Sequence, residues 1–300
     1  MTTNSEKNFD IKNLTSFKIG GKISEVFFPE SVNEFVHILN ENENIKVFGN
    51  LSNTLISDSG IDGKIILTHK MNKISIDGTR VVADCGVKGP KLAQEVCSKG
   101  LSGFEFMIGF PGSVGGEVCM NASANSQAIS DKLISVTCYS EKDGIVKYSK
   151  AEMNFGYRTS RCHNEKLIVL QAEFELDKKN PIEIQSKMNE NLNFRKKHQP
   201  SMALPNCGSI FKNPDGDSAG RLLDSVGAKQ MVCGGAKVWE NHANFIINHR
   251  AGSSLDVLKL MLQMHNKVKE VRNVELVPEI IFLGGKNKKE NEIWQILNKK

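Results

Sequence analysis

Several features that mark other protein classes are missing from this chain of 300 residues. None of the seven cysteines forms a CxxC pair, and their odd number argues against a disulfide framework or a zinc site. The N-terminus lacks the apolar segment of a signal peptide, and no stretch reaches the length of a membrane span. We therefore expect a cytoplasmic protein with reduced thiols, no metal and no membrane contact.

The net charge of the chain without its C-terminal tail is also small. The formal charge is +5, but residues 286–300 hold five lysines and two glutamates, which leaves only +2 for the rest. So weak a charge argues against a nucleic-acid surface and remains compatible with anionic small molecules. A hydrophobic content of 39% allows a sizeable core, and we expect a monomer.

The commonest nucleotide and hydrolase signatures are absent as well. Residues 109–116 read Gly-Phe-Pro-Gly-Ser-Val-Gly-Gly, with neither the Gly-Lys-Ser/Thr of a P-loop nor the Rossmann glycine spacing. No GxSxG elbow surrounds Ser209. The four glycines are compatible with a tight structural loop, but their density favours a loop whose amides approach a phosphate.

A second turn of small residues covers 48–56. Its Asn50, Ser52 and Asn53 can support irregular backbone or bind an anion. Taken alone it is most simply a turn between two strands. Together with the glycine loop it suggests a bound nucleotide that carries a diphosphate.

Short strands alternate with helices along the first two thirds of the chain. A capping box at Ser31 opens a helix to about Asn40, and Gly89-Pro90 opens another to Lys99. Lys142-Asp143-Gly144 predicts a hairpin. Strands are expected at 45–48, 64–67, 80–84, 134–140, 145–149 and 167–176.

The remaining third predicts a separate α/β segment. Pro181 opens a polar helix that must end before Pro200, and we expect a domain boundary near it. Ser253 caps a long helix, and residues 244–247 and 279–283 are expected to form a strand pair. The helix has an apolar stripe, which is expected to face the core rather than a cofactor, of Val257, Met261, Met264, Val268 and Val271. The tail after Gly285 is expected to be frayed, with a weak amphipathic piece around Trp294.

The stretch 206–214, Asn-Cys-Gly-Ser-Ile-Phe-Lys-Asn-Pro, is the most informative part of the chain. Strand alternation places Ser209, Phe211 and Asn213 on one side, and Ile210 and Lys212 on the other. A hydroxyl and an amide on one face suit a polar ligand, but an ordinary edge strand explains the same residues equally well.

Three isolated side chains carry weaker signals. Arg158 lies between an aromatic and two hydroxyls, where it can hold a carboxylate or simply lie on the surface. Glu279 begins an apolar strand, where burial would favour its protonated form, although a lone glutamate at a strand start is more often simply exposed. His242 has no partner set for metal or triad chemistry and is expected to be a hydrogen-bonded structural residue.

Taken in order, these segments resemble the UDP-N-acetylenolpyruvoylglucosamine reductases of peptidoglycan synthesis. The likeness runs from about Leu14 to Gly284. No single motif decides it, but seven in the same order are specific. They are 15–21, 49–54, 111–121, Tyr157-Arg158-x-Ser160, 208–214, 242–248 and Pro278-Glu279.

The resemblance implies an α+β fold with a vanillyl-alcohol-oxidase (PCMH)-type FAD-binding domain of two subdomains and a C-terminal α/β substrate domain. The corresponding ranges are 1–13 for an N-terminal extension, 14–180 for the FAD domain, 181–285 for the substrate domain and 286–300 for a basic tail. FAD would be bound non-covalently, take a hydride from NADPH and pass it to the enolpyruvyl double bond of the UDP-sugar.

The resemblance also implies roles for individual residues. Ser209 matches the proton donor, and Arg158 and Glu279 match the pair that polarises the substrate carboxylate. Tyr157, Arg158, Lys212 and Asn213 correspond to substrate-pocket residues. The FAD contacts are expected at Gly49, Asn50, Ser52, Asn53, Pro111, Gly112, Ser113, Gly115, Gly116 and Asn121.

The chain departs from the family pattern in places. Leu51 stands where a glycine is usual, Glu117 where a small residue is usual, and 161–163 are more polar than usual. No tyrosine-bearing insertion occurs in 176–205, so the chain resembles the shorter type.

Two other functions compete with the reductase. One is an oxidase on the same fold, which often attaches FAD covalently through histidine or cysteine; the glycine loop has neither, although Cys119 is close in sequence. The other is a nucleotide-binding regulator, which would be expected to lose Arg158, Ser209 or Glu279.

Overall fold

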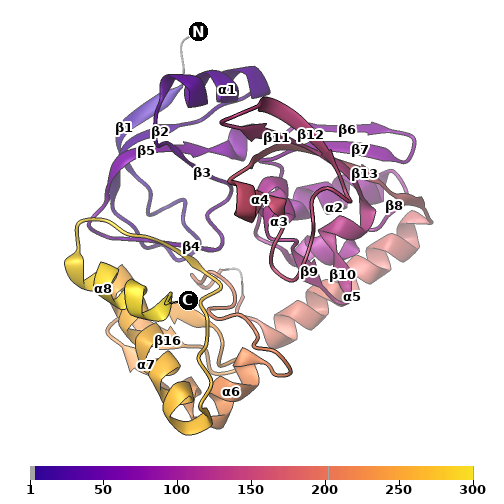
Figure 1. The fold of residues 1–300 in the computed structure, drawn as a ribbon. Helices are drawn as coiled ribbons and strands as arrows, with labels where there is room; N and C mark the ends of the chain where they lie inside the picture. Colours follow the sequence, from indigo (N-terminus) through magenta and orange to yellow (C-terminus); the bar gives the residue numbers. More distant parts are fainter. Residues whose placement is uncertain (1–3, 202, 300) are drawn as a thin grey trace. The chain divides into compact units, whose positions relative to one another are not determined.

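The computed structural model describes residues 4–201 and 203–299 (Figure 1). Residues 1–3 of the expected N-terminal extension and Lys300 of the tail lie outside that range. The chain divides into two compact units. The first comprises Met1–Glu6, Val26–Asn50 and Lys64–Arg195, and the second Lys7–Glu25, Leu51–Gly63 and Lys196–Lys300. The expected domain ranges stay a proposal.

An antiparallel five-stranded sheet of order β12-β11-β13-β7-β6 forms the centre of the first unit (Figure 1). Its strands are β6 (Ile74–Asp77), β7 (Arg80–Asp84), β11 (Leu133–Ser140), β12 (Gly144–Ser149) and β13 (Ile168–Glu175). The predicted hairpin is confirmed: Ser140 pairs with Gly144, whose φ of 69° suits a residue without a Cβ.

Helices complete the first unit, and the predicted starts are confirmed. The α1 helix (Val32–Glu41) begins at Ser31, whose side chain accepts from the N–H of Glu34 at 3.3 Å. The α2 helix (Gly89–Ser98) has its proline in the first turn, and α5 (Pro181–His198) ends before Pro200. The shorter pieces are η1 (Thr68–Lys70), β8 (Leu101–Ser102), η2 (Glu105–Gly109), α3 (Val114–Cys119), β9 (Ser123–Ala124), β10 (Gln127–Ala128), η3 (Ile129–Lys132), α4 (Arg161–Glu165) and β14 (Asp177–Lys178).

A smaller four-stranded sheet has the order β1-β2-β5-β3, from β1 (Ser5–Asp10), β2 (Lys22–Phe27), β3 (Lys46–Phe48) and β5 (Ile61–Leu67). The β3 and β5 strands are parallel, with Val47 opposite Ile66. A parallel pair needs a crossover connection, so residues 49–60 must leave the sheet before β5 begins. The small-residue turn lies at the start of that crossover.

Three α-helices, one 3-10 helix and two small sheets lie in the described part of the second unit. The sheet β15-β16-β17 uses Val232–Cys233, Ala236–Val238 and Ile246–Asn248, and β4 (Thr54–Ile56) pairs in parallel with β18 (Ile281–Leu283). Its helical elements are α6 (Ala219–Ser225), η4 (Ala228–Gln230), α7 (Ser254–Arg272) and α8 (Lys288–Leu297).

Three expectations about the second unit were wrong. Residues 244–247 and 279–283 do not pair, because β17 joins β16 and β18 joins β4, which is far away in sequence. In the α7 stripe Val271 is 48% exposed, because the helix extends past the core in its last turn. The tail is not frayed between 288 and 297, since α8 buries Ile293 and Leu297 against the core of the unit.

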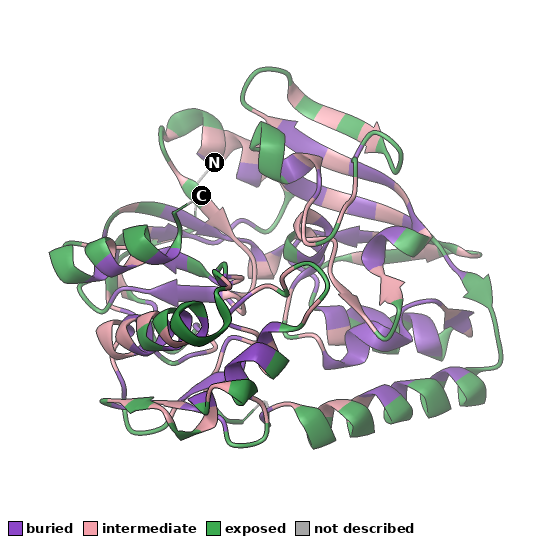
Figure 2. Ribbon diagram, turned by 60° about the horizontal axis from the view of Figure 1, so that its bottom comes forward, coloured by how far each residue is buried: buried purple, intermediate pink, exposed green. Residues whose placement is uncertain are grey.

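Each unit has its own hydrophobic core, and the elements are amphipathic around it. Figure 2 shows buried residues along the strands and exposed residues along one side of the helices. The first core includes Phe35, Phe104 and Phe174, and the second includes Phe17 and Phe211. Burial of such side chains is the main favourable term in folding, so each unit has a hydrophobic core that can hold the loops around it in place.

Candidate active site

The glycine loop is held in the first unit by the segment that follows β7. Val114 N–H donates to Val87 O at 2.8 Å, and Gly89 N–H donates to Gly112 O at 3.2 Å. These two bonds flank the bridge between Lys88 and Ser113, so the N–H of Ser113 is turned away from Lys88. A Cβ on Gly115 would lie 2.8 Å from Cys85 Cβ, which explains why only glycine fits there.

The turn after β3 meets the glycine loop within the first unit. Asn50 Nδ2 donates to the carbonyl of Pro111 at 2.5 Å. A Cβ on Gly49 would collide with Ser113 Oγ, so the backbone of Gly49 lies directly against the loop. The structure thus brings together Gly49, Asn50, Pro111 and Ser113, which come from two of the predicted FAD segments.

Polar atoms near this junction fit a phosphate ligand. Ser113 is 2% exposed, and its Oγ has no hydrogen-bond partner in the described part of the chain. Asn121 Oδ1 is likewise buried without a partner, while its Nδ2 donates to Gly156 O at 3.1 Å. Buried polar atoms are costly unless they are satisfied, so a hydroxyl left in this state suits a bound polar group. The residues present therefore fit the diphosphate of FAD.

Two residues beside the loop were not among the predicted contacts. The Arg195 side chain of α5 runs over the loop, with its Cδ 2.9 Å from the position of a Cβ on Gly109. Burial lowers the pKa of Arg195, which has no ion pair among the described residues and so presents a cation to an anionic ligand. The other is Glu117 of α3, whose carboxyl lies against Gly89 and Gly112. Arg195 left no signal in the sequence because it lies in a polar helix.

Arg158 lies at the tip of a tight turn in the first unit. Gly156 N–H donates to Thr159 O at 3.1 Å, and Arg158 adopts a left-handed φ of 54°. Its guanidinium carbon lies 5.7 Å from the centre of the Tyr157 ring, which is 59% exposed. The turn is fixed to α3, because Ser160 Oγ donates to the carbonyl of Cys119 at 2.8 Å. The predicted pair Tyr157 and Arg158 is thus presented by one rigid turn.

Free thiols lie next to the Arg158 turn, and they do not form disulfides. Cys119 lies at the end of α3, with its Sγ 3.8 Å from His163 Nδ1. A hydrogen bond with Cys162 and burial both raise the pKa of Cys119, so it is not a reactive thiolate. All seven cysteines are free, as predicted, and no metal-binding cluster occurs within residues 4–201 and 203–299.

The segment around Ser209 is held from both sides in the second unit. Ser209 bridges to Phe245 and Phe211 to Pro278, so the segment is not an edge strand. Ile210 and Phe211 are both fully buried between the two neighbours, so burial does not distinguish the two faces that strand alternation predicts. Ser209 itself is partly exposed, and Lys212 N–H donates to Val277 O at 2.9 Å.

Glu279 lies on the chain segment beside Ser209. Glu279 N–H donates to Ile210 O at 2.8 Å, which places the two predicted catalytic residues on neighbouring segments. Asn53 Nδ2 donates to the carbonyl of Glu279 at 3.0 Å, so the side chain of Asn53, a predicted FAD contact, supports the backbone of Glu279. Burial, and then the Glu279 carboxylate, raises the pKa of Cys207 well above its ordinary value.

Asn244 is a positioning residue that the sequence did not single out. Its Oδ1 accepts from Phe211 N–H at 3.0 Å and its Nδ2 donates to Phe211 O at 2.8 Å. Asn244 N–H in turn donates to His242 Nδ1 at 3.2 Å, which confirms His242 as a hydrogen-bonded structural residue. Burial lowers the pKa of His242 and keeps it neutral, as an acceptor must be.

The remaining predicted residues have structural surroundings of their own. Asn213 is exposed, and its Oδ1 accepts from Ala219 N–H at 3.0 Å at the start of α6. Ser52 is held through its own backbone, because the Ser52 carbonyl accepts a hydrogen bond from the Ser16 hydroxyl at 3.3 Å. Leu51 has a left-handed φ of 51°, which explains why a glycine is usual at this position.

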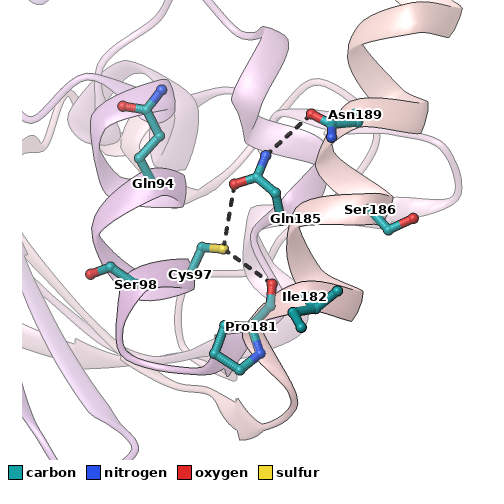
Figure 3. A pocket seen from close by; sticks show the side chains of 8 residues that line it. All are labelled: Gln94, Cys97, Ser98, Pro181, Ile182, Gln185, Ser186 and Asn189. Carbon is teal, nitrogen blue, oxygen red and sulfur yellow. Dashed lines mark hydrogen bonds between the residues drawn. The ribbon is translucent and has the colours of Figure 1, made fainter.

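An open groove lies between α2 and α5 in the first unit (Figure 3). Its volume is about 560 Å³, and Cys97 Sγ lies 3.8 Å from Pro181 O and 4.0 Å from Gln185 Oε1. The lining is composed of amides, hydroxyls and apolar groups, without a cation for an anionic ligand. The groove therefore contributes nothing to the candidate site.

Comparison with known proteins first defines the class. A family model described as an FAD binding domain matches residues 23–149. The α+β architecture and this match make the chain a flavoprotein oxidoreductase with a fold of the vanillyl-alcohol-oxidase type, as predicted.

The particular family follows from relatives that span the chain. The model of the UDP-N-acetylenolpyruvoylglucosamine reductase C-terminal domain matches residues 199–283. Reductases of that name from Caldicellulosiruptor bescii and Carboxydothermus hydrogenoformans are 39% and 40% identical, over 93% and 90% of this chain and 90% and 91% of theirs. The crystal structure of the Thermus caldophilus enzyme matches with a TM-score of 0.81 and 31% identity, over 95% of this chain and 100% of that one. The chain belongs to the UDP-N-acetylenolpyruvoylglucosamine reductase family.

Proposed function

We propose that this protein reduces UDP-N-acetylglucosamine enolpyruvate to UDP-N-acetylmuramate, a step of peptidoglycan synthesis, with NADPH as hydride donor. Membership of the reductase family along nearly the full chain carries the proposal. It is supported by the presence of Arg158, Ser209 and Glu279, all three of the residues that the chemistry requires. No helix within the described ranges is long and apolar enough to cross a bilayer. We propose a cytoplasmic monomer.

The glycine loop and the turn after β3 would hold the cofactor. Gly49, Asn50, Pro111, Gly112, Ser113, Gly115, Gly116 and Asn121 are proposed as FAD contacts, together with Ser52 and Asn53 as backbone contacts. The cofactor supplies the hydride, and binding is non-covalent because the Cys119 thiol is engaged with His163 and Cys162. This engagement disfavours a covalent-flavin oxidase.

The catalytic side chains act on the substrate carboxylate and its α-carbon. Hydride adds to the β-carbon of the enolpyruvyl group, so negative charge grows toward the carboxylate. A guanidinium at Arg158 stabilises that charge through two parallel hydrogen bonds. Glu279 contributes when it carries a proton that it can donate, and Ser209 donates its hydroxyl proton to the α-carbon. Lys212 and Asn213 are proposed to line the substrate pocket, with Lys212 assisting proton return to Ser209.

An anaerobic two-step assay tests the proposal. NADPH should bleach the bound flavin, and the enolpyruvyl UDP-sugar should restore its oxidised spectrum without oxygen. A flavin that NADPH bleaches but the sugar cannot reoxidise would exclude the reductase. Protein that binds nucleotide but is never bleached would favour a regulator.

A variant of Ser209 separates the half-reactions. Ser209→Ala should leave bleaching unchanged and slow reoxidation by about 10²–10⁴-fold, because only the second step needs a proton donor. Ser98→Ala, an exposed serine at the end of α2, is the matched control and should behave like wild type. Equal damage to both half-reactions would remove Ser209 from the donor role.

A further inference from the structure

Glu117 is a buried acid without a partner in the glycine-loop region. The residue is 4% exposed, and neither carboxyl oxygen has a hydrogen-bond partner within the described residues. A Cβ on Gly89 would lie 2.6 Å from Oε1, and one on Gly112 would lie 2.9 Å from it. Two glycines therefore leave room for this carboxyl, one at the first turn of α2 and one in the loop itself.

Burial decides the protonation state of this carboxyl. A charged carboxylate without hydrogen bonds is strongly disfavoured away from water, and burial raises the pKa of Glu117 to about 8. At neutral pH the side chain is therefore mostly an acid, with one O–H to donate. Nothing in the described chain accepts that proton, so the donor is available to a ligand.

Charged neighbours do not account for this shift. The elements packed against α3 are β7, β13, η3 and α4, and the start of α2 lies against the Glu117 carboxyl. Their titratable groups are Arg80 and Asp84, Glu173 and Glu175, Asp131 and Lys132, Arg161, His163 and Glu165, Lys88 and Lys91, together with the thiols of Cys85, Cys119 and Cys162. None of them contributes to the pKa of Glu117, whose sole cause of shift is burial.

A second unsatisfied group, in the loop beside Glu117, points to the ligand. Ser113 Oγ is buried without a partner in the described part of the chain, and Gly112, which the Glu117 carboxyl touches, precedes it in the chain. Two hydroxyl-type donors, one from serine and one from a neutral acid, suit an anionic oxygen that accepts from both. Once charged, the same carboxyl would repel that oxygen across a region with little water.

We propose that Glu117, in its protonated form, is an FAD-binding residue of this chain that donates a hydrogen bond to the cofactor's diphosphate, and that loss of its proton weakens FAD binding. A small residue at this position could not do this, so the proposal makes cofactor affinity pH-dependent in this chain. It rests on FAD being the ligand of the glycine loop.

The test is FAD titration of protein stripped of cofactor, followed by flavin fluorescence from about pH 6 to about pH 9. Wild-type affinity should be nearly constant below pH 8 and about tenfold weaker at pH 9 than at pH 6. Glu117→Gln keeps an N–H donor but cannot titrate, so its affinity should stay flat with pH. Glu95→Gln, an exposed position of α2, is the matched control and should keep the wild-type decline.

Two further ligands locate the contact. ADP-ribose carries the diphosphate without a group that titrates in this range, and its binding should show the same decline. Riboflavin lacks the diphosphate and should bind independently of pH. A flat wild-type profile, a decline that persists in Glu117→Gln, or a decline confined to riboflavin would each overturn the proposal. If FAD fails to bind at any pH, the proposed function itself fails, which is a distinct result.

Discussion

The glycine loop of the first unit and the Ser209 segment of the second unit differ in whether their buried polar groups have hydrogen-bond partners. In and beside the loop, Ser113 Oγ and both Glu117 oxygens are buried without partners among residues 4–201 and 203–299. In the Ser209 segment, one amide of Asn244 satisfies both backbone groups of Phe211, and Asn53 supports the carbonyl of Glu279. The first arrangement is suited to receive a ligand's atoms, and the second fixes the backbone around the proposed catalytic residues Ser209 and Glu279 without a ligand.

If this contrast is correct, the largest effect should come from removing the support in the second unit. Asn244→Leu leaves the buried N–H and C=O of Phe211 unsatisfied, so the free energy of unfolding should fall by about 4 kcal/mol. Urea unfolding measures this. Asn189→Leu removes an exposed amide of α5 and should change stability by less than about 0.5 kcal/mol. Similar losses in the two variants would show that Asn244 is not a support.

The next effect should come from filling the space where the turn after β3 and the glycine loop, the two proposed FAD contacts, meet. Gly49→Ala drives a methyl group into Ser113 Oγ and should weaken FAD binding by roughly tenfold or more, measured by titration of stripped protein. Combining it with Ser113→Gly removes the colliding hydroxyl and should recover part of the lost affinity. Gly63→Ala meets no atom closer than 3.9 Å and should bind FAD normally.

The unsatisfied acid also predicts how the stability of cofactor-free protein depends on pH. The pKa of Glu117 is raised from 4.5 to about 8 on folding, so the folded state holds the proton more tightly than the unfolded state. Its contribution is fully present below pH 4.5 and is lost as the pH rises toward 8. Compared with wild type, Glu117→Gln should therefore gain stability between pH 5 and pH 8, by on the order of a few kcal/mol. Equal pH profiles of the two melting curves would contradict the burial of an unpaired acid.

The smallest effects should come from the amides of the second unit that serve as local supports. Asn213→Ala removes the acceptor for Ala219 N–H at the start of α6 and should cost about 1 kcal/mol of stability. If Asn213 also contacts substrate, the KM for the UDP-sugar should rise while FAD affinity stays unchanged. A loss of FAD affinity would place Asn213 in the wrong site.

Local structure followed from the sequence where the signal was local. The capping residues Ser31 and Ser253, the proline in the first turn of α2 and the hairpin at Gly144 act within a few residues, so their elements formed as predicted. The pairing of β18 failed because its partner β4 lies more than two hundred residues away, and strand length alone does not specify a partner. The tail forms α8 because Ile293 and Leu297 pack into the core of the second unit. This packing depends on residues distant in sequence, so no local pattern predicts it.

The sequence by itself determined the family, the fold class, the cofactor and which residue types the reaction needs, because ordered motifs and side-chain chemistry are written in the chain. Tertiary structure decided which polar groups are satisfied. It placed the Asn53 amide against Glu279, made Asn244 the support of the Ser209 segment, and left Glu117 buried without a partner among the residues that the structure describes. These outcomes depend on contacts between segments distant in sequence and on exclusion of water, and neither is fixed until both cores have packed.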